Sequence, residues 1–246
     1  MFRYLTAGES HGKALNVILE GIPSGLEIDI EEISIELSRR RLGYGRGPRM
    51  RFEQDEVEIL GGVRHGVTLG SPISIVIHNS EWPKWQEEMS VAKGITNKKL
   101  TQPRPGHADL AGMRKYDLDD ARNVLERASA RETAARVAAG SIAKLVMRQM
   151  GTEILSHVLS IGEARVSSDS PRPTFSDLET IDANEVRCFD TSSTEKIISE
   201  IKAAAKAGDS LGGVVEVLGF DVPEGLGSHV HWDRKIDGLL AQALMS

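Results

Sequence analysis

The sequence predicts an α+β fold with antiparallel sheets, on three observations. Short apolar runs separated by Gly or Pro turns recur through the first third of the chain. A few longer segments carry helical periodicity and helix-cap signals. Strand and helix segments do not alternate at the spacing of β-α-β units, which argues against a parallel sheet. A length of 246 residues is compatible with one large domain or two small ones.

The predicted strands come first. Apolar or alternating runs separated by Gly or Pro turns are typical of strands, and five such runs lie at 2–6, 15–20, 57–60, 63–65 and 73–78. We interpret the last three as a meander. The polar stretch 81–102 that follows predicts no regular element.

Helix signals mark four further segments. Asp29 can cap a helix over 29–41, and Ser129 and Glu132 have the spacing of a capping box at the start of 129–150. Two more helices are predicted over 193–207 and 234–245. Strands are predicted over 153–161 and 212–220, and residues 166–187, with two prolines, are predicted to form a loop.

The composition excludes some classes of function. The formal net charge is −6, and an acidic chain is a poor general binder of nucleic acid or anionic membranes. The sequence contains no run of about 18 apolar residues, so no membrane span is predicted. The single cysteine permits no disulfide within the chain, and we therefore expect a cytoplasmic protein.

Arginines form the first candidate site. Six of them and no acid lie in the window 39–51, interleaved with glycines. Arginine grips carboxylate or phosphate with two parallel hydrogen bonds, and glycines let a loop close around a ligand. A solvated basic face is the alternative. Arg127 and Arg131 flank the predicted helix start at Ser129, where free N–H groups favour an anion.

Histidines form the second candidate site. His11 and His107 lie in glycine-bearing loops, where a side chain that donates a proton near neutral pH can be displayed. Simple surface histidines are the alternative. His229 and His231 would share one face of a strand, but no further ligands complete a metal site. Ser10 lacks the surroundings of a nucleophile elbow, which disfavours a hydrolase.

Several of these stretches together resemble motifs of the chorismate synthase family. They occur in the family's order and cover the chain from end to end: 8–12, 39–47, 104–109 and 127–134, with 208–210 and 243–246 fitting as well. The resemblance implies a single domain over residues 1–246, with a β-α-β sandwich of antiparallel sheets around a helical layer. It implies a cytoplasmic homotetramer that binds neither nucleic acid nor membrane.

The resemblance also implies a reaction and its residues. Chorismate synthases eliminate phosphate from 5-enolpyruvylshikimate 3-phosphate with reduced FMN, and NADPH is a candidate reductant of the flavin. By matching motifs, His11 protonates the leaving phosphate and His107 assists protonation of the flavin. The matched substrate contacts are Ser10, Arg40, Arg46, Arg49, Arg104 and Arg131. The matched cofactor contacts are Arg40, Arg46, His107, Arg127, Ala128 and Ser129.

Members of the family continue beyond the position that corresponds to Ser246. We therefore expect the chain to be an incomplete chorismate synthase domain, which lacks some flavin contacts and binds FMN weakly. The alternatives are an inactive truncated homologue or an anion-binding module that needs a full-length subunit.

Overall fold

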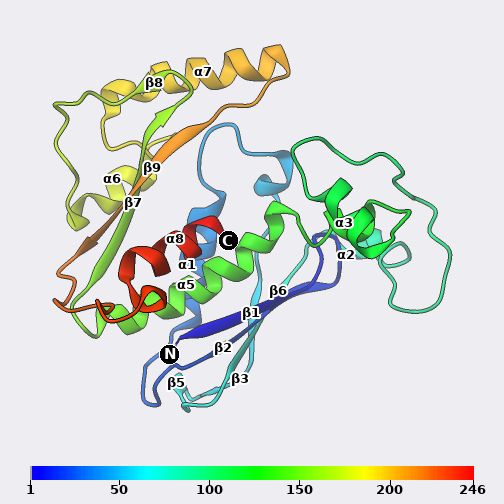
Figure 1. Ribbon diagram of the computed structural model, residues 1–246, viewed down its shortest axis with the longest axis horizontal. Coiled ribbons are helices and arrows are strands. Elements are labelled where there is room, and N and C mark those ends of the chain that lie inside the picture. The colour runs from blue at the N-terminus through cyan, green and yellow to red at the C-terminus, as the bar shows by residue number, and fades with distance from the viewer. Residues whose placement is uncertain (1) are drawn as a thin grey trace.

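The computed structural model describes residues 2–246 and has two antiparallel sheets with helices between and around them (Figure 1). The first sheet has the order β1-β2-β6-β3. Its strands are β1 (Arg3–Ala7), β2 (Ala14–Glu20), β6 (Ile73–His78) and β3 (Val57–Gly61). The fold is therefore the mixed α+β type with antiparallel sheets that the sequence predicts.

The meander expected over residues 57–78 is wrong. Strand β6 pairs with β3 on one side and with β2 on the other. The last of the four strands in sequence order therefore lies inside the sheet and not at its edge. A separate hairpin of β4 (Val63–Arg64) and β5 (Val67–Thr68) joins β3 to β6. This hairpin reverses the chain, and β6 can therefore return alongside β3.

Two helices cover one face of this sheet. Helix α1 (Ile30–Arg41) is capped by Asp29, as predicted, and packs beside α5 (Thr133–Arg148). The small residues of α5 let it approach closely, and Ala134, Ala135 and Ala138 are fully buried. Alternate residues of β2 and β6 meet these helices and are wholly inaccessible: Leu15, Val17, Leu19, Ile73, Ile75 and Ile77.

The second sheet has the order β8-β7-β9 and lies near the other side of α5 (Figure 1). Its strands are β8 (Ala164–Arg165), β7 (Glu153–Ile161) and β9 (Gly213–Phe220), and helix α7 (Thr194–Ala207) packs on β7 and β8. The loop expected over 166–187 is wrong in part. A capping box of Thr174 and Asp177 starts a helical segment that continues as α6 (Leu178–Ala183).

Short helices complete the chain. A lobe beside the first sheet carries α2 (Trp82–Trp85), α3 (Asp109–Tyr116) and α4 (Arg122–Leu125), and α8 (Ile236–Met245) ends the described chain (Figure 1). Single 3-10 turns span Pro48–Arg51, Ala130–Glu132, Phe175–Asp177, Thr191–Ser193 and Trp232–Arg234. Within residues 2–246, no helix is both long and apolar enough to cross a membrane.

Two local expectations need correction. Ser129 caps the helix start by accepting a 3.2 Å hydrogen bond from the N–H of Arg131, but Glu132 does not complete the capping box. Its carboxylate accepts instead from Thr6 and from the charged Arg136, a stronger donor than a backbone N–H. His229 and His231 lie in an irregular segment rather than a strand, so the shared face expected for them is wrong.

Candidate functional site

The candidate site lies at one end of the four-stranded sheet. The register of β1, β2 and β6 brings the turn after β1 next to the segment that follows β6. The C-terminus of α1 and the N-terminal turn of α5 reach the same end, as their contacts with these segments show. Sequence-distant loops therefore meet where three strands and two helices end.

His11 is held there from three sides. Its Nδ1 lies 2.9 Å from both carboxylate oxygens of Glu126, and its backbone N–H donates to the same carboxylate at 2.8 Å. The ring of Trp85 lies over it, with the centroids 4.3 Å apart. Its Nε2 points to the other side, where the nearest carboxylate oxygen belongs to Glu81 at 3.7 Å. The imidazole is therefore fixed in position: Nδ1 is hydrogen-bonded to Glu126, and Nε2 remains available to a ligand.

Glu126 is 2% exposed and belongs to the end of α4. It also accepts a 3.0 Å hydrogen bond from Nη1 of Arg122, itself nearly buried. Burial by itself raises the pKa of the Glu126 carboxyl, but the hydrogen bonds from His11 and Arg122 outweigh it and hold that pKa below its usual value. Glu126 is therefore an ionised acceptor at neutral pH.

Ser10 and Arg49 form the next contact in the site. The guanidinium of Arg49 donates to the hydroxyl of Ser10 at 2.8 Å and to its carbonyl at 2.7 Å. Ser129, at the start of the α5 segment, donates to the same hydroxyl at 3.2 Å. The turn next to His11 is thereby tied to the 3-10 turn after α1 and to the start of the long helix.

Below this contact lies a buried ionic network. Arg131 is 3% exposed and pairs with Asp55, lies 3.6 Å from Glu53, and donates to Asn79 at 2.8 Å. Burial raises the pKa of Glu53, but donors from Ser80 and the nearby Arg131 bring it below its usual value. These acids neutralise much of the positive charge that the sequence places here.

The six arginines of the window 39–51 do not form one basic face. Arg40 lies 3.5 Å from Asp55, and burial lowers its pKa. Arg39 turns away to Asp182 of α6 at 2.6 Å, and Arg46 is exposed and donates to a carbonyl of its own loop. Of the predicted substrate contacts, the structure joins Ser10, Arg40, Arg49 and Arg131 in one network and leaves Arg46 outside it.

Arg104 and His107 form a separate group just before α3. Both contact Asp109, which is fully buried and accepts from the Arg104 side chain and backbone at 3.0 Å each. Burial opposes ionisation, but the donors from Arg104 and His107 outweigh it and lower the pKa of Asp109 to about 2. Among residues 2–246, no ion pair or hydrogen bond links this group to His11 or Arg49.

Three of the six predicted flavin contacts line a cavity of their own, whereas Arg40, Arg46 and His107 lie outside it. Arg127, Ala128 and Ser129 line a hollow of ≈ 430 Å³ beside β1. The guanidinium of Arg127 donates to the carbonyl of Thr6 at 3.0 Å and is 42% exposed, so part of it remains free for a ligand. A half-exposed guanidinium and the serine hydroxyl at a helix start form a donor set suited to a phosphate or a polar ring edge.

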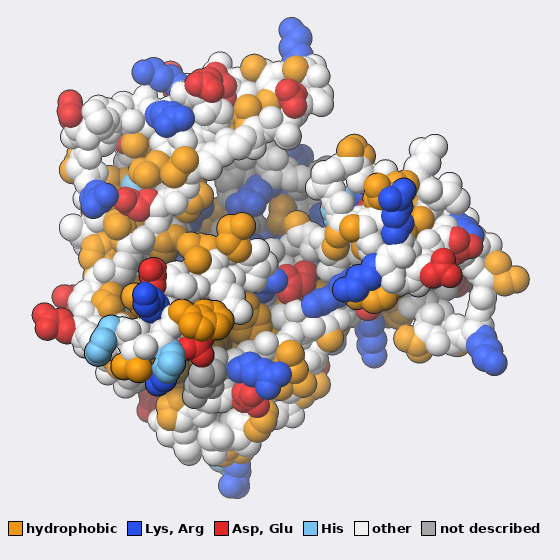
Figure 2. Space-filling view, viewed as in Figure 1, with side chains coloured by type: hydrophobic (Ala, Val, Ile, Leu, Met, Phe, Trp, Pro, Cys, Tyr) orange, Lys and Arg blue, Asp and Glu red, His pale blue; other side chains and the backbone are white. Residues whose placement is uncertain are grey.

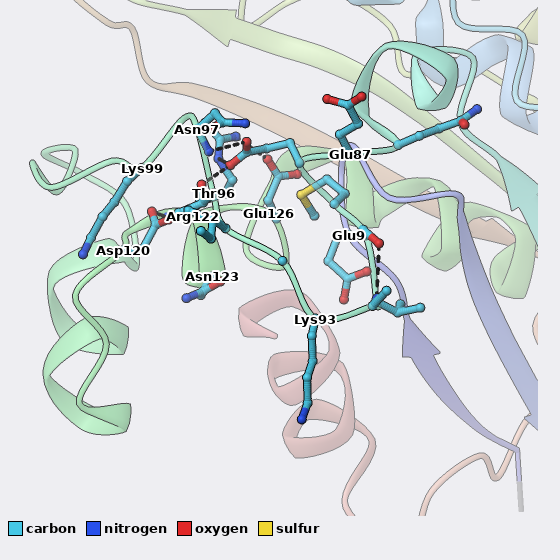
Figure 3. A pocket seen from close by; sticks show the side chains of 18 of the residues that line it. Glu9, Glu87, Lys93, Thr96, Asn97, Lys99, Asp120, Arg122, Asn123 and Glu126 are labelled. Atoms are coloured by element: carbon cyan, nitrogen blue, oxygen red, sulfur yellow. Dashed lines mark hydrogen bonds and ion pairs between the residues drawn. The ribbon is translucent and has the colours of Figure 1, made fainter.

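A larger cavity of ≈ 950 Å³ lies on the other side of Glu126. Figure 3 shows Arg122 and Glu126 side by side on its wall, while Lys93 and Lys99 point away from them. Figure 2 shows a recess between the mass that carries α7 and the lobe of α2 and α3, with Lys and Arg side chains inside it. The molecule is thus hollowed on the side where the charged loops gather.

Sequence reasoning missed the acids and the amide of this site. Glu53 and Asp55 follow the arginine window directly, so their order in the sequence offered a signal. Glu126 lies directly before the stretch 127–134, and its position next to Arg127 was the available signal. Asn79 carries no local signal, because its three partner segments lie far away in the chain.

Known proteins that resemble this chain in sequence and in fold are described in the same way, as chorismate synthases. The family model described as chorismate synthase matches residues 2–246. A chorismate synthase of Salinispora tropica is 58% identical over 255 residues, which cover 100% of this chain and 65% of the relative. One of Thermobifida fusca is 55% identical with the same coverage.

A solved structure agrees with these sequence comparisons. It is described as a crystal structure of chorismate synthase, is 42% identical and superposes with a TM-score of 0.79. The match covers 99% of this chain and 66% of the other. The chain therefore spans about two thirds of the length of the proteins that it matches.

Proposed function

The chain belongs to the chorismate synthase family, and from that premise we propose that it carries out the family's phosphate elimination. The reaction is a 1,4-trans elimination of phosphate from 5-enolpyruvylshikimate 3-phosphate, which gives chorismate for aromatic amino acid biosynthesis. One observation carries the proposal: His11 presents a free ring nitrogen beside Arg49 and Ser10, at the end of the sheet. A proton donor and an anion holder are the parts that a departing phosphate needs.

In this proposal the residues divide the work. His11 donates the proton that the leaving phosphate takes up, and Arg49 attracts the anion by its positive charge. Ser10 orients Arg49, and Arg131 neutralises Glu53 and Asp55 so that the pocket accepts an anion. Arg40, Arg46 and Arg104 are the further proposed substrate contacts.

Reduced FMN is the proposed cofactor, with NADPH as its reductant. Arg127, Ala128 and Ser129 would hold the flavin, because they supply a half-exposed guanidinium and a hydroxyl beside a cavity. Arg40 and Arg46 are additional proposed contacts, and His107 would assist protonation of the flavin. When bound, the electron-rich flavin stabilises the electron deficiency that develops on the substrate as phosphate leaves. We further propose a cytoplasmic homotetramer in which residues 1–246 belong to a single domain.

Anaerobic phosphate release with reduced FMN and 5-enolpyruvylshikimate 3-phosphate tests the proposal. We expect His11→Ala to slow release by about 10²- to 10⁴-fold, which is the usual contribution of general acid catalysis. His229→Ala, an exposed histidine of an irregular segment, is the matched control and should release phosphate at the wild-type rate. Equal rates for wild type and His11→Ala would show that His11 is not the donor.

A further inference from the structure

We infer that Glu126 is a positioning residue that fixes the tautomer of His11, so that the proton exchanged with the ligand always resides on Nε2. The inference rests on the proposed function, because that function gives His11 the role of proton donor. Three hydrogen bonds from His11 and Arg122 converge on the Glu126 carboxylate.

The tautomer follows from the chemistry of the carboxylate. An ionised carboxylate can only accept hydrogen bonds, so Nδ1 of His11 must be the donor at 2.9 Å. The donors around Glu126 hold its pKa below the usual value, and it therefore remains an acceptor when His11 gains or loses a proton. Nδ1 keeps its hydrogen in both states, and only Nε2 changes.

The ring cannot readily turn over to exchange its two nitrogens. Trp85 covers one face of it, and the cations of Lys98 and Arg122 lie over Trp85 at 4.3 and 5.0 Å. The backbone N–H of His11 is bound by the same carboxylate as its ring, so loop and side chain are fixed together. The ring is thus held before any ligand arrives.

The groups on the Nε2 side are of a different kind. Glu81 lies 3.7 Å from Nε2 and 3.8 Å from Nε of Arg49, both beyond a hydrogen bond. Its side chain is 19% exposed, whereas that of Glu126 is 1% exposed. Glu81 is therefore a loose neighbour of Nε2, and an incoming phosphate can replace it. In the transfer, the bond from Nε2 to its proton breaks and a phosphate O–H bond forms, leaving neutral His11 with its hydrogen on Nδ1.

Long-range ¹H–¹⁵N correlation of the ring nitrogens, in the full chain with ¹⁵N-labelled histidine, measures the tautomer directly. The His11→Gln variant identifies the signals of His11. At a pH where the ring is neutral, wild-type His11 should show Nδ1 protonated and Nε2 unprotonated. Glu126→Gln should shift the tautomer ratio about tenfold towards Nε2–H, the effect of losing one charge-assisted hydrogen bond.

Three further variants make the test specific. Glu126→Asp keeps the negative charge and should bring the His11 tautomer ratio closer to the wild-type value than Glu126→Gln does. Glu81→Gln should leave it unchanged, because Glu81 makes no hydrogen bond to the ring. Glu58→Gln is the matched control, since Glu58 pairs with the exposed His78 at 3.2 Å and its loss should alter only the His78 signals.

Two results would overturn the inference. One is a wild-type spectrum with the neutral His11 proton on Nε2, a result that does not depend on whether Glu126→Gln folds. The other is a tautomer ratio that Glu126→Gln leaves within twofold, or that Glu81→Gln shifts as much. The measurement involves no turnover. A chain with the expected tautomer that releases no phosphate would therefore count against the proposed function alone.

Discussion

Two histidine–carboxylate pairs in this molecule use the same chemistry in opposite settings. His107 meets Asp109, two residues further along the chain, whereas His11 meets Glu126, 115 residues away. The side chain of Arg104, the cation of the first pair, is 51% exposed, whereas that of Arg122, the cation of the second, is 11% exposed. Both carboxylates are buried and both histidines are 23% exposed, so the pairs differ in their cations and in their separation along the chain. The first is a local loop pair whose cation contacts water, whereas the second is a tertiary contact whose cation is nearly buried.

The largest expected effect separates the two pairs by stability. Glu126→Ala removes the nearer charge partner of the nearly buried Arg122, which keeps only Glu88 at 3.8 Å, and should lower the free energy of unfolding by about 3 kcal/mol. Asp109→Ala leaves a cation that water can solvate, and should cost about 1 to 2 kcal/mol. Urea unfolding of both variants measures the difference. Similar losses would show that the two carboxylates are equally integral to the fold.

Acid titration gives a smaller effect that belongs to the local pair. The pKa of Asp109 is about 2 in the folded chain and 3.8 in the reference state, so folding depresses it. Its stabilisation is complete above pH 4 to 5 and is lost as the pH falls towards 2. Wild type should lose about 1 to 2 kcal/mol more than Asp109→Asn over that range, because water screens part of the Arg104 interaction. Parallel pH dependences in the two proteins would contradict this.

Salt gives the smallest expected effect. Raising the ionic strength from 0.05 M to 1 M screens exposed charges but reaches buried pairs poorly. The penalty of Asp109→Asn should shrink by about 0.5 kcal/mol, while that of Glu126→Gln should stay constant. Urea unfolding at the two salt concentrations is the measurement. A penalty for Glu126→Gln that falls with salt would place that carboxylate in contact with solvent.

The contrast between a local pair and a long-range pair also explains which parts of the fold the sequence could predict. Helix 129–150 is predicted from helical periodicity and a serine cap at its start, and the structure confirms α5 within it. Helix α3 was missed, because eight residues that end at an αL aspartate, Asp117, carry little periodic signal. The position of β6 inside the sheet depends on a hairpin whose strands are two residues long, and the sequence pattern predicted only the first of them, at 63–65.

The site shows the same division. Composition predicted an anion site from the arginines, but Arg39 is paired with Asp182, 143 residues away, and no local pattern could show this. His11 was identified as the candidate acid from its glycine-bearing turn. The carboxylate that orients it lies within a motif on another element and was not connected with it. The sequence indicates which residue types form the site, whereas the partner of each residue becomes known only from the fold.

The long separation between His11 and Glu126 has a consequence for synthesis. A ribosome adds about 5 to 20 residues per second, so roughly 6 to 23 seconds pass between the two residues. During that interval the nascent turn after β1 lacks the carboxylate that binds His11 and the backbone carbonyl that binds the N–H of Ser10. Strand β2 meanwhile has no α5 to cover Leu15 and Val17. We therefore expect the newly made hairpin to expose this apolar face until more than half of the chain has emerged.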